Sequence, residues 1–304
     1  MDCDPAMTSL THALSVDVED WNNLVVLNRT GRIVPPQPAV VHNTERMLEL
    51  FQAHGARATW FTLGEVADAY PALIRKLADA GQEIGVHGYH HHLVYTLTES
   101  AFREAIRRAK DALEQAGGQA VLGYRAPAFS IDARVPWALD VLAELGFRYD
   151  SSVFPFRGRR YGDPRAPLTL YARPTRHGPL MEVPLTVVDW GSRRLPCAGG
   201  GYLRHFPLAY TRWAMRAVER RRRPAVIYLH PYEIDEAYDA DFLHQHLARH
   251  ERRGFGRVRW LQYRGRSRTE RKLRWLLGHY RFDGLARVFG LEAAPSPARV
   301  AASA

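Results

Sequence analysis

Short apolar, β-branched stretches alternate with amphipathic ones along the first half of the sequence, and this alternation limits the fold more than any other feature. Expected strands lie at residues 12–18, 57–63, 83–87, 121–125 and 147–152, and expected helices lie between them at 38–55, 71–81, 98–118 and 133–146. Short connections and this order are typical of a parallel sheet with helices outside it, either doubly wound or closed as a barrel. The 304 residues are enough for one large α/β domain or two small ones.

The second half of the chain interrupts this rhythm before resuming it. Residues 153–205 are rich in proline, glycine and arginine, although 181–190 still has the pattern of a strand. A helix is then expected at 207–222 and a fully buried strand at 224–230. The sequence contains no internal repeat, which argues against a repeat architecture.

Ionisable residues follow the expected strands. Asp17, His87, Arg125, Asp150 and His230 each fall at or just past the carboxyl end of one of them. In a parallel barrel these ends share one face, and that face holds the active site. Each residue taken alone is an ordinary loop residue, but the convergence of all five predicts a catalytic site.

Two dense groups of polar residues form a candidate metal site. The first strand runs into Asp17, Glu19 and Asp20, whose mutual repulsion requires a cation, a basic partner or water. The stretch 83–95 contributes His87 and His91, which are four residues apart and can meet one ion if the loop coils into a helical turn. Two histidines and one carboxylate suit a catalytic zinc or a similar divalent ion. The alternative is a histidine-rich loop exposed to solvent.

The carboxylate ligand is predicted to be Glu19, with Asp20 as the alternative. Side chains alternate along a strand, so Asp17 and Glu19 point to one face and Asp20 points to the other. If the extended conformation lasts through Glu19, that residue lies beside Asp17, and Asp20 caps the segment that follows. If the strand ends at Asp17, Asp20 becomes available instead.

Positive charge is concentrated near the carboxyl end of the chain. The net charge is +10, and residues 251–290 hold 12 arginines or lysines against Glu251, Glu270 and Asp283. One interpretation is a surface for an acidic polymer, an anionic membrane or nucleic acid. The other is an arginine-rich, solvated pair of helices that packs through its interleaved tryptophans and leucines. Nucleic-acid binding rests on charge alone and is not expected.

Cysteine content and the amino-terminal sequence bear on location. The two cysteines, Cys3 and Cys197, are no disulfide framework and leave the redox compartment open. The first 16 residues lack the basic and apolar regions of a secretory signal, and no window approaches 18 apolar residues. We expect a cytoplasmic protein, with a peripheral position at the inner membrane as an option.

Seven segments in order give the chain a resemblance to a known family. They are SVDVEDW (15–21), HGYHHHLVY (87–95), GYRAPAFS (123–130), YDSSVFP (149–155), EVPLT (182–186), GGGYLR (199–204) and IYLHPYE (227–233). With these segments the chain resembles the polysaccharide deacetylases of carbohydrate esterase family 4, and most of all their exopolysaccharide-locus subgroup associated with exosortase systems. The family's adjacent acidic pair is replaced here by Asp17-Val18-Glu19-Asp20.

The resemblance implies a fold, an activity and a cofactor. The fold is a distorted (β/α) barrel at residues 10–240, with a basic helical extension packed on it at 241–290 and a disordered tail at 291–304. The activity is that of a hydrolase that removes N-acetyl groups from amino sugars of an extracellular polysaccharide, or of an oligosaccharide precursor. The implied cofactor is a divalent metal, with zinc favoured and cobalt or nickel as alternatives.

The resemblance also implies a role for each residue at the strand ends. Asp17 takes the place of the catalytic base, and His87 and His91 take those of the metal-binding histidines. Arg125 takes the place of the arginine that pairs with the base, and His230 that of the general acid. The remaining carboxyl group, that of Asp150, is expected to orient His230. A divalent ion would polarise the amide carbonyl and acidify water, and each proton transfer contributes about 10²–10⁴-fold in rate.

Four aromatic residues are candidates for stacking on sugar rings, or else for ordinary loop packing: Tyr89, Phe129, Trp190 and Tyr202. A backbone N–H in the loop 126–129 is a candidate oxyanion donor.

Two other classes of function stay open. One is a metal-independent amidohydrolase of the same superfamily that acts on a small cyclic amide, as allantoinase-like members do. Those members lose the histidine ligands, whereas this chain keeps them. The other is a non-catalytic glycan-binding or assembly protein on a former enzyme scaffold, with the basic carboxyl-terminal segment as its working surface.

Overall fold

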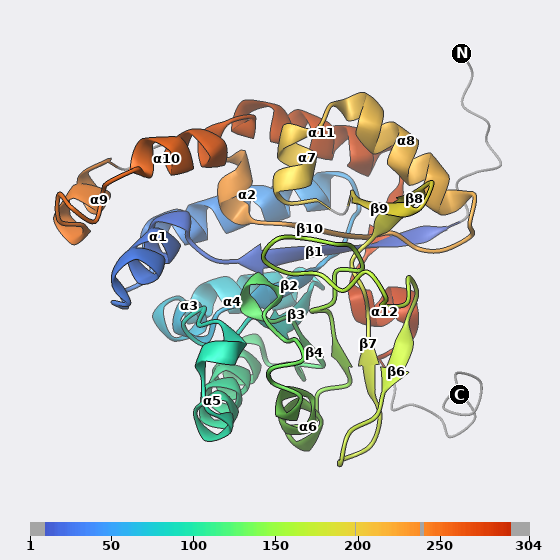
Figure 1. Ribbon diagram of the computed structural model, residues 1–304, viewed down its shortest axis with the longest axis horizontal. Coiled ribbons are helices and arrows are strands. Elements are labelled where there is room, and N and C mark those ends of the chain that lie inside the picture. The colour runs from blue at the N-terminus through green and yellow to red at the C-terminus, as the bar shows by residue number, and fades with distance from the viewer. Residues whose placement is uncertain (1–9, 198, 238–239, 293–304) are drawn as a thin grey trace.

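The computed structural model describes residues 10–197, 199–237 and 240–292, and its centre is a nine-stranded sheet curled into an open half-barrel (Figure 1). The strands follow the order β10-β1-β2-β3-β4-β5-β7-β6, and β11 pairs with β1 as well. Their bounds are Thr11–Val18 (β1), Thr59–Thr62 (β2), Glu83–Val86 (β3), Gly123–Tyr124 (β4), Tyr149–Asp150 (β5), Tyr171–Arg173 (β6), Leu180–Glu182 (β7), Val226–Leu229 (β10) and Arg281–Asp283 (β11). Only the β6–β7 pair is antiparallel among these pairings of the described strands.

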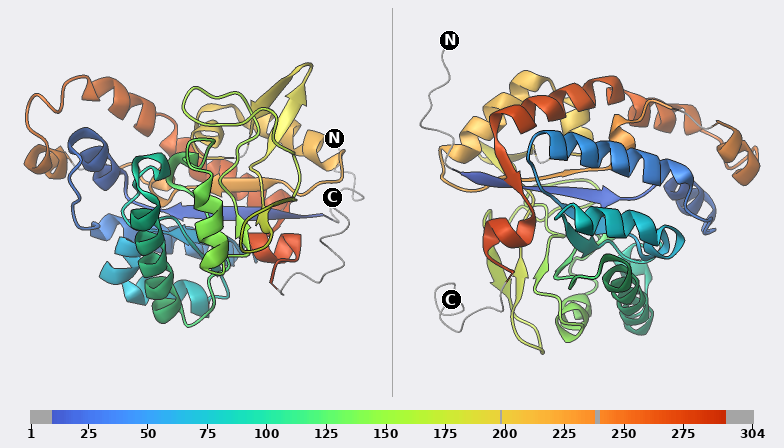
Figure 2. Two further views of the ribbon diagram at one scale, coloured as in Figure 1. Left: turned by 60° about the horizontal axis from the view of Figure 1, so that its bottom comes forward. Right: turned by 180° about the vertical axis from the view of Figure 1, so that it is seen from behind.

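Helices cover the outside of this sheet on both sides (Figures 1 and 2). In the view of Figure 1, α2, α7, α8, α10 and α11 form a layer above β1 and β10, while α3 to α6 lie below, beside β2 to β5. The helices are Trp21–Thr30 (α1), Pro38–Ala53 (α2), Gly64–Ala69 (α3), Pro71–Asp79 (α4), Glu99–Gly117 (α5), Trp137–Glu144 (α6), Gly201–His205 (α7), Leu208–Glu219 (α8), Ala240–His246 (α9), Phe255–Tyr263 (α10), Arg266–His279 (α11) and Leu285–Phe289 (α12). None of the described helices combines the length and apolar character needed to span a bilayer.

Local sequence explains where the main helices begin and end. The longest, α5, begins after Thr98, whose hydroxyl accepts a hydrogen bond from the N–H of Ala101, and it ends at Gly118 with a φ of 68°. Pro38 stands in the first turn of α2, where its missing N–H costs nothing.

Strand β1 organises the sheet because it has neighbours on both edges. Ala13 pairs with Val226 of β10 on one edge and with Asp283 of β11 on the other. Further along, Ser15 pairs with Thr59 of β2, so β11 and β2 share one edge of β1 in succession. All of these pairings are parallel, and the strands therefore point their carboxyl ends toward one side of the sheet.

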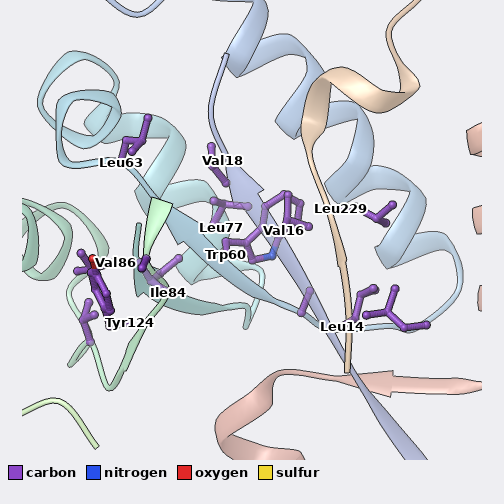
Figure 3. Packing of buried hydrophobic residues seen from close by; sticks show 14 of the residues in the cluster. Leu14, Val16, Val18, Trp60, Leu63, Leu77, Ile84, Val86, Tyr124 and Leu229 are labelled. Atoms are coloured by element: carbon purple, nitrogen blue, oxygen red, sulfur yellow. The ribbon is translucent and has the colours of Figure 1, made fainter. Parts of the chain in front are cut away.

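The core lies between the sheet and its helices (Figure 3). Leu14, Val16 and Val18 alternate along β1 and pack with Trp60, Ile84 and other buried apolar side chains of the neighbouring strands. The indole N–H of Trp60 donates to Gln82 Oε1 over 3.0 Å, so even its polar atom is satisfied in the core.

The α/β architecture, with a mostly parallel sheet curled like a distorted (β/α) barrel, is confirmed. The stretch expected as one strand at 181–190 is divided instead into β7, an irregular segment at 183–186 and Val187–Trp190 (β8). Strand β8 pairs with Arg193–Pro196 (β9) in a separate hairpin. Helix α1 and strand β11 were not expected. The predicted boundary at residue 240 stays a prediction, although β11 joins the central sheet rather than packing on its surface. Cys3 and most of the predicted tail, residues 293–304, lie outside the described residues.

Candidate active site

Four strands bring five polar side chains together at the carboxyl end of the sheet. Strand β1 carries Asp17 and leads to Glu19, while His87 follows β3, Arg125 follows β4 and His230 follows β10. All five belong to the buried or half-buried part of the structure. Four of the five residues predicted to converge after the strands, Asp17, His87, Arg125 and His230, thus lie together, and Glu19 joins them.

Arg125 is fully buried and holds Asp17 from one side. Its guanidinium donates to Asp17 Oδ1 over 2.7 Å and to Ser15 Oγ over 2.8 Å. It also donates to the carbonyl and the hydroxyl of Ser151, at 3.1 and 3.0 Å, and lies 4.3 Å from the ring centroid of Phe61. With its donors used in this way, Arg125 orients the Asp17 carboxylate and compensates its buried charge.

Glu19 faces two histidines. Its Oε2 lies 3.4 Å from His87 Nε2 and 3.0 Å from His91 Nε2, and one ligand atom from each of the three residues falls within 4.8 Å of the others. These are the three residues that the sequence proposes as metal ligands, and their role stays a prediction.

The donor set fits a divalent cation. The Nδ1 atom of His87 lies 2.9 Å from the Arg125 carbonyl oxygen, which can only accept, so Nδ1 carries the proton and Nε2 presents a lone pair. That lone pair faces Glu19 Oε2, a buried oxygen without a hydrogen-bond partner among the described residues. Two acceptors facing each other in a buried site require a proton or a metal ion between them, and two nitrogens with one oxygen suit zinc.

The loop that carries the histidines does not form the helical turn expected from their spacing. Gly88 and His91 instead have left-handed φ values of 84° and 60°, which turn the chain back on itself. A Cβ on Gly88 would also lie 3.1 Å from Pro127 Cγ. A non-glycine residue with such a φ is strained, and strain of this kind gathers at functional sites.

Asp20 points away from the histidines and caps α1. Its Oδ1 accepts from the N–H groups of Asn22 and Asn23, over 2.7 and 3.2 Å. The backbone at Asp20 is still extended, with φ −106° and ψ 128°, so the alternation of side chains continues past Val18. Burial raises the pKa of Asp20, and these two N–H groups oppose that rise.

His230 is oriented by Glu233. The carboxylate of Glu233 lies 3.3 Å from His230 Nδ1 and accepts the His230 backbone N–H over 3.1 Å, while Arg204 donates to its other oxygen over 3.2 Å. The Nε2 atom of His230 faces Glu19 Oε1 at 3.5 Å and Asp17 Oδ2 at 4.0 Å. Burial disfavours the charged imidazole, but the hydrogen bond to Glu233 and the charges of Glu19 and Asp17 outweigh it and raise the pKa of His230 to about 9.

The predicted contact between Asp150 and His230 is corrected by this arrangement. Among the described residues, Asp150 accepts from Ser152 Oγ, and that hydroxyl accepts the Ala126 N–H over 2.8 Å. Asp150 also lies beside Glu182, which is fully buried. It therefore supports the loop after Arg125 rather than the imidazole, because β5 ends under that loop and β10 lies on the other edge of β1.

Two of the aromatic candidates belong to a cluster beside the site. Phe129 lies 5.3 Å from Tyr228 between ring centroids, and Tyr228 lies 5.5 Å from His230. Tyr202 is half-buried and packs against Phe154 at 5.8 Å. The two others lie apart from this cluster. Tyr89 is buried, with its hydroxyl on Asp68 and Arg108 over its ring, and Trp190 of the β8–β9 hairpin is 63% exposed.

The loop 126–129 leaves one N–H for the predicted oxyanion role. Ala126 N donates to Ser152 Oγ and Phe129 N donates to the Ala126 carbonyl, while Pro127 has no N–H. The remaining donor is Ala128, which adopts a φ of 49°.

Sequence reasoning missed Glu233 and Arg204 as site residues. Both stood in quoted segments, Glu233 in IYLHPYE and Arg204 in GGGYLR. The signal for Glu233 was its position three residues after the histidine, whereas Arg204 stood in a different segment. The turn Pro231–Ile234 brings Glu233 back to His230, which periodicity does not predict. Tyr232 was missed as well; its ring stacks on His230 at 4.9 Å.

Two family models match the chain in succession. One is described as polysaccharide deacetylase and matches residues 35–149. The other is described as a domain of unknown function (DUF3473) and matches residues 151–290. His87, His91 and Arg125 fall in the first match and His230 in the second, whereas Asp17 and Glu19 precede both.

Curated relatives match over a limited length. A peptidoglycan deacetylase of Helicobacter pylori is 29% identical over 108 residues, which are 36% of this chain and 36% of that protein. A peptidoglycan-N-acetylglucosamine deacetylase of Bacillus cereus is 30% identical over 98 residues, which are 32% of this chain and 36% of that protein. The chain thus spans about a third of the length of these relatives.

Solved structures share the fold over nearly the whole chain. A Mycobacterium smegmatis protein proposed to be a polysaccharide deacetylase has a TM-score of 0.62 at 21% identity, covering 97% of this chain and 95% of its own. A Pseudomonas aeruginosa protein with the same proposed assignment has a TM-score of 0.58 at 17% identity, covering 96% and 95%. Puue allantoinase has a TM-score of 0.54 at 18% identity, covering 91% and 93%.

Proposed function

We propose that this chain, whose residues 35–149 form a polysaccharide deacetylase domain, is a metal-dependent hydrolase that removes N-acetyl groups from amino sugars of a glycan. The observation that carries the proposal is that His230 Nε2 faces both Asp17 and Glu19, while Glu19 also faces His87 and His91. A base, an acid and a candidate ligand set thus share one buried site.

The residues have complementary tasks in amide hydrolysis. Asp17, held by Arg125, takes a proton from the attacking water. His230, kept protonated at neutral pH by Glu233, donates its Nε2 proton to the departing amine, so that acetate and a free amino sugar result. The Ala128 N–H is the candidate donor for the developing oxyanion. Glu19, His87 and His91 would hold a divalent ion, which when bound supplies Lewis-acid stabilisation of the carbonyl oxygen.

The substrate and setting belong to the proposal. The quoted segments support an extracellular polysaccharide or its oligosaccharide precursor as substrate, and a place in the exopolysaccharide-locus subgroup. Zinc is the favoured metal because its usual catalytic sites combine three nitrogen or oxygen ligands with an open position. A cytoplasmic location, peripheral to the inner membrane, fits a precursor substrate.

An allantoinase-like activity is the second candidate, because the fold is shared with Puue allantoinase. The cluster of Glu19, His87 and His91 favours the metal-dependent reaction. Metal content of the purified protein separates the two.

Acetate release from a panel of N-acetylated glycans tests the proposal. Chelation should abolish release and added zinc or cobalt should restore it. Asp17→Asn should lose about 10²–10⁴-fold in rate while it retains the metal, since it removes the base and leaves the ligands. Full activity of metal-free protein, or wild-type turnover of Asp17→Asn, would contradict the proposed chemistry.

A further inference from the structure

Helices α8, α10 and α11 lie in one layer on the same side of the sheet (Figures 1 and 2). Most arginines of this layer are exposed. Arg212 of α8 lies 4.7 Å over the Trp275 ring of α11, which joins two of these helices. We call this surface the basic face, and it consists of Arg212, Arg216, Arg257, Arg264, Arg268, Arg271 and Arg274.

Little negative charge offsets the basic face. Residues 255–274 contain seven arginines and Lys272 against one acidic residue, Glu270. Glu270 is paired with Arg274 at 2.7 Å and with Arg46 at 2.6 Å. Lys272 is turned inward, where its ammonium donates to the carbonyls of residues 203, 204 and 206 at the end of α7. The segment therefore uses Lys272 and the buried Arg266 for structure and presents its other arginines to solvent.

Apolar side chains are exposed among these arginines. Trp260 is 56% exposed and Leu261 is 45% exposed. Arg257, Trp260 and Leu261 have the spacing i, i+3, i+4, which places them on one side of α10. Arg264, which follows the helix, lies 4.8 Å over the Trp260 ring. Trp213 of α8, 37% exposed, adds a second tryptophan to the layer. An adjacent tryptophan and leucine exposed beside arginines are typical of a helix that binds a membrane interface.

We propose that the basic face binds an anionic phospholipid bilayer, with Trp260 and Leu261 inserted at the headgroup boundary. Arginines attract the negative surface, and an adjacent tryptophan and leucine gain by leaving water for the interface. A soluble polyanion would satisfy the arginines but would offer no apolar phase to Trp260 and Leu261. This inference goes beyond the proposed deacetylation and does not depend on it.

The packing of α10 also relates the bilayer to the candidate active site. Phe255, at the start of α10, packs with Val25 and Val26 of α1, the helix that follows β1 at the carboxyl end of the sheet. Arg266, at the start of α11, lies 5.2 Å over the Tyr232 ring, which stacks on His230. A bilayer on the basic face would therefore lie beside the end of the sheet that carries His230, where a membrane-carried glycan could reach it.

Vesicle co-sedimentation of the full chain tests the proposal, with phosphatidylcholine alone and with added phosphatidylglycerol. The protein should bind only the anionic vesicles. Arg257→Gln/Arg264→Gln should weaken the partition coefficient about 25-fold, since each arginine near an anionic surface contributes about fivefold. Trp260→Ser/Leu261→Ser should weaken it about tenfold or more, and this loss should persist at salt concentrations that screen the charges.

Matched controls separate the basic face from general charge. Arg107→Gln/Arg176→Gln removes two exposed arginines on α5 and in the β6–β7 turn and should leave binding unchanged. Thermal unfolding of every variant should match that of the parent, because all substituted side chains are exposed.

Several results would overturn the proposal. They are absence of binding to anionic vesicles, equal loss in the control variant, and no effect of Trp260→Ser/Leu261→Ser. Binding to duplex DNA or to an anionic polysaccharide, without binding to vesicles, would assign the basic face to a soluble polyanion. A concentration-dependent dimer that Trp260→Ser/Leu261→Ser abolishes would assign it to a second copy of the chain.

Discussion

At the scale of single residues, the three acids of SVDVEDW have three different partners. Asp17 pairs with Arg125, Glu19 faces His87 and His91, and Asp20 accepts backbone N–H groups. Burial alone would raise the pKa of Glu19, but the neighbouring histidines outweigh it and lower that pKa well below its usual range. Burial raises the pKa of Asp20 because its partners are only two amides. Asp20 is thus engaged as a helix cap, whereas Glu19 faces the two histidines, and its role as the metal ligand stays a prediction.

Substitution of each acid should separate ligand from cap. Glu19→Gln should lose bound zinc, because an amide oxygen is a weaker ligand than a carboxylate. Asp20→Asn should keep the metal and the stability of the protein, because asparagine caps a helix about as well as aspartate. Zinc content after dialysis is the measurement. Retention of zinc by Glu19→Gln and its loss from Asp20→Asn would reverse the assignment.

The buried pair of Asp150 and Glu182 should make stability depend on pH. Burial, followed by the charge of Asp150, raises the pKa of Glu182 well above its usual range, and burial also raises that of Asp150. The folded state then keeps protons that the unfolded state has released, so the free energy of unfolding falls as pH rises from the unfolded pKa through the folded one. Glu182→Gln should remove this fall, since glutamine has no proton to lose.

Urea unfolding at pH 5 and pH 8 checks the expectation for Glu182. Relative to the parent, Glu182→Gln should be more stable at pH 8 than at pH 5. Glu104→Gln, at an exposed position of α5, should show no such trend. A parent protein that gains stability steadily between these pH values, with Glu182→Gln behaving alike, would contradict the raised pKa.

At the scale of elements, a glycine turn places helix α7 against strand β10. Gly199 forms a bridge with Tyr228, and Gly200 N donates to the Tyr228 carbonyl over 2.8 Å. A Cβ on Gly199 would lie 1.9 Å from that carbonyl oxygen, so only glycine fits. The close approach lets α7 begin beside β10 and carry Arg204 to Glu233.

Gly199→Ala should therefore destabilise the protein by more than about 2 kcal/mol, by combining an unfavourable φ of 109° with overpacking. Gly278→Ala is the matched control, because a Cβ there meets nothing within 4 Å inside α11. That control should gain about 0.5–1 kcal/mol from helix propensity. Urea unfolding measures both, and a neutral Gly199→Ala would refute the close approach.

At the scale of the whole molecule, the carboxyl-terminal segment is part of the core as well as a basic surface. Leu273, Leu276 and Leu277 of α11 are buried in the main core cluster, and β11 pairs with β1. The two interpretations of the basic segment thus apply to opposite sides of the same helices. The inner side packs on the core, and the outer side is the basic face.

Removal of residues 251–304 should leave an insoluble or unstable protein, since it uncovers β1 and the core. Leu276→Ala should cost about 2–5 kcal/mol, whereas Leu261→Ala, at an exposed position, should change stability by less than about 0.5 kcal/mol. Solubility and urea unfolding are the measurements. A soluble truncated protein with parental stability would show that the segment is an independent addition.

The sequence by itself determined the features that depend on local periodicity. Alternating strand and helix patterns predicted the parallel α/β fold, and the polar residues after each strand predicted one convergent site, because parallel strands bring their carboxyl ends together wherever they lie in the order. The place of Glu19 beside Asp17 followed from side-chain alternation, once the extended conformation continued to Asp20.

The tertiary structure alone decided which groups meet where the backbone turns sharply or where distant segments pack. Glu233 rather than Asp150 lies against His230, because a tight turn after β10 folds back locally while β5 lies several strands away in the sheet. Packing between segments far apart in the chain likewise decided three other features. They are the left-handed turn of the His87–His91 loop, the pairing of β11 with β1, and which side of α11 is buried. Residue spacing carries no record of such contacts, since they are selected by the register of the strands and the space left between elements.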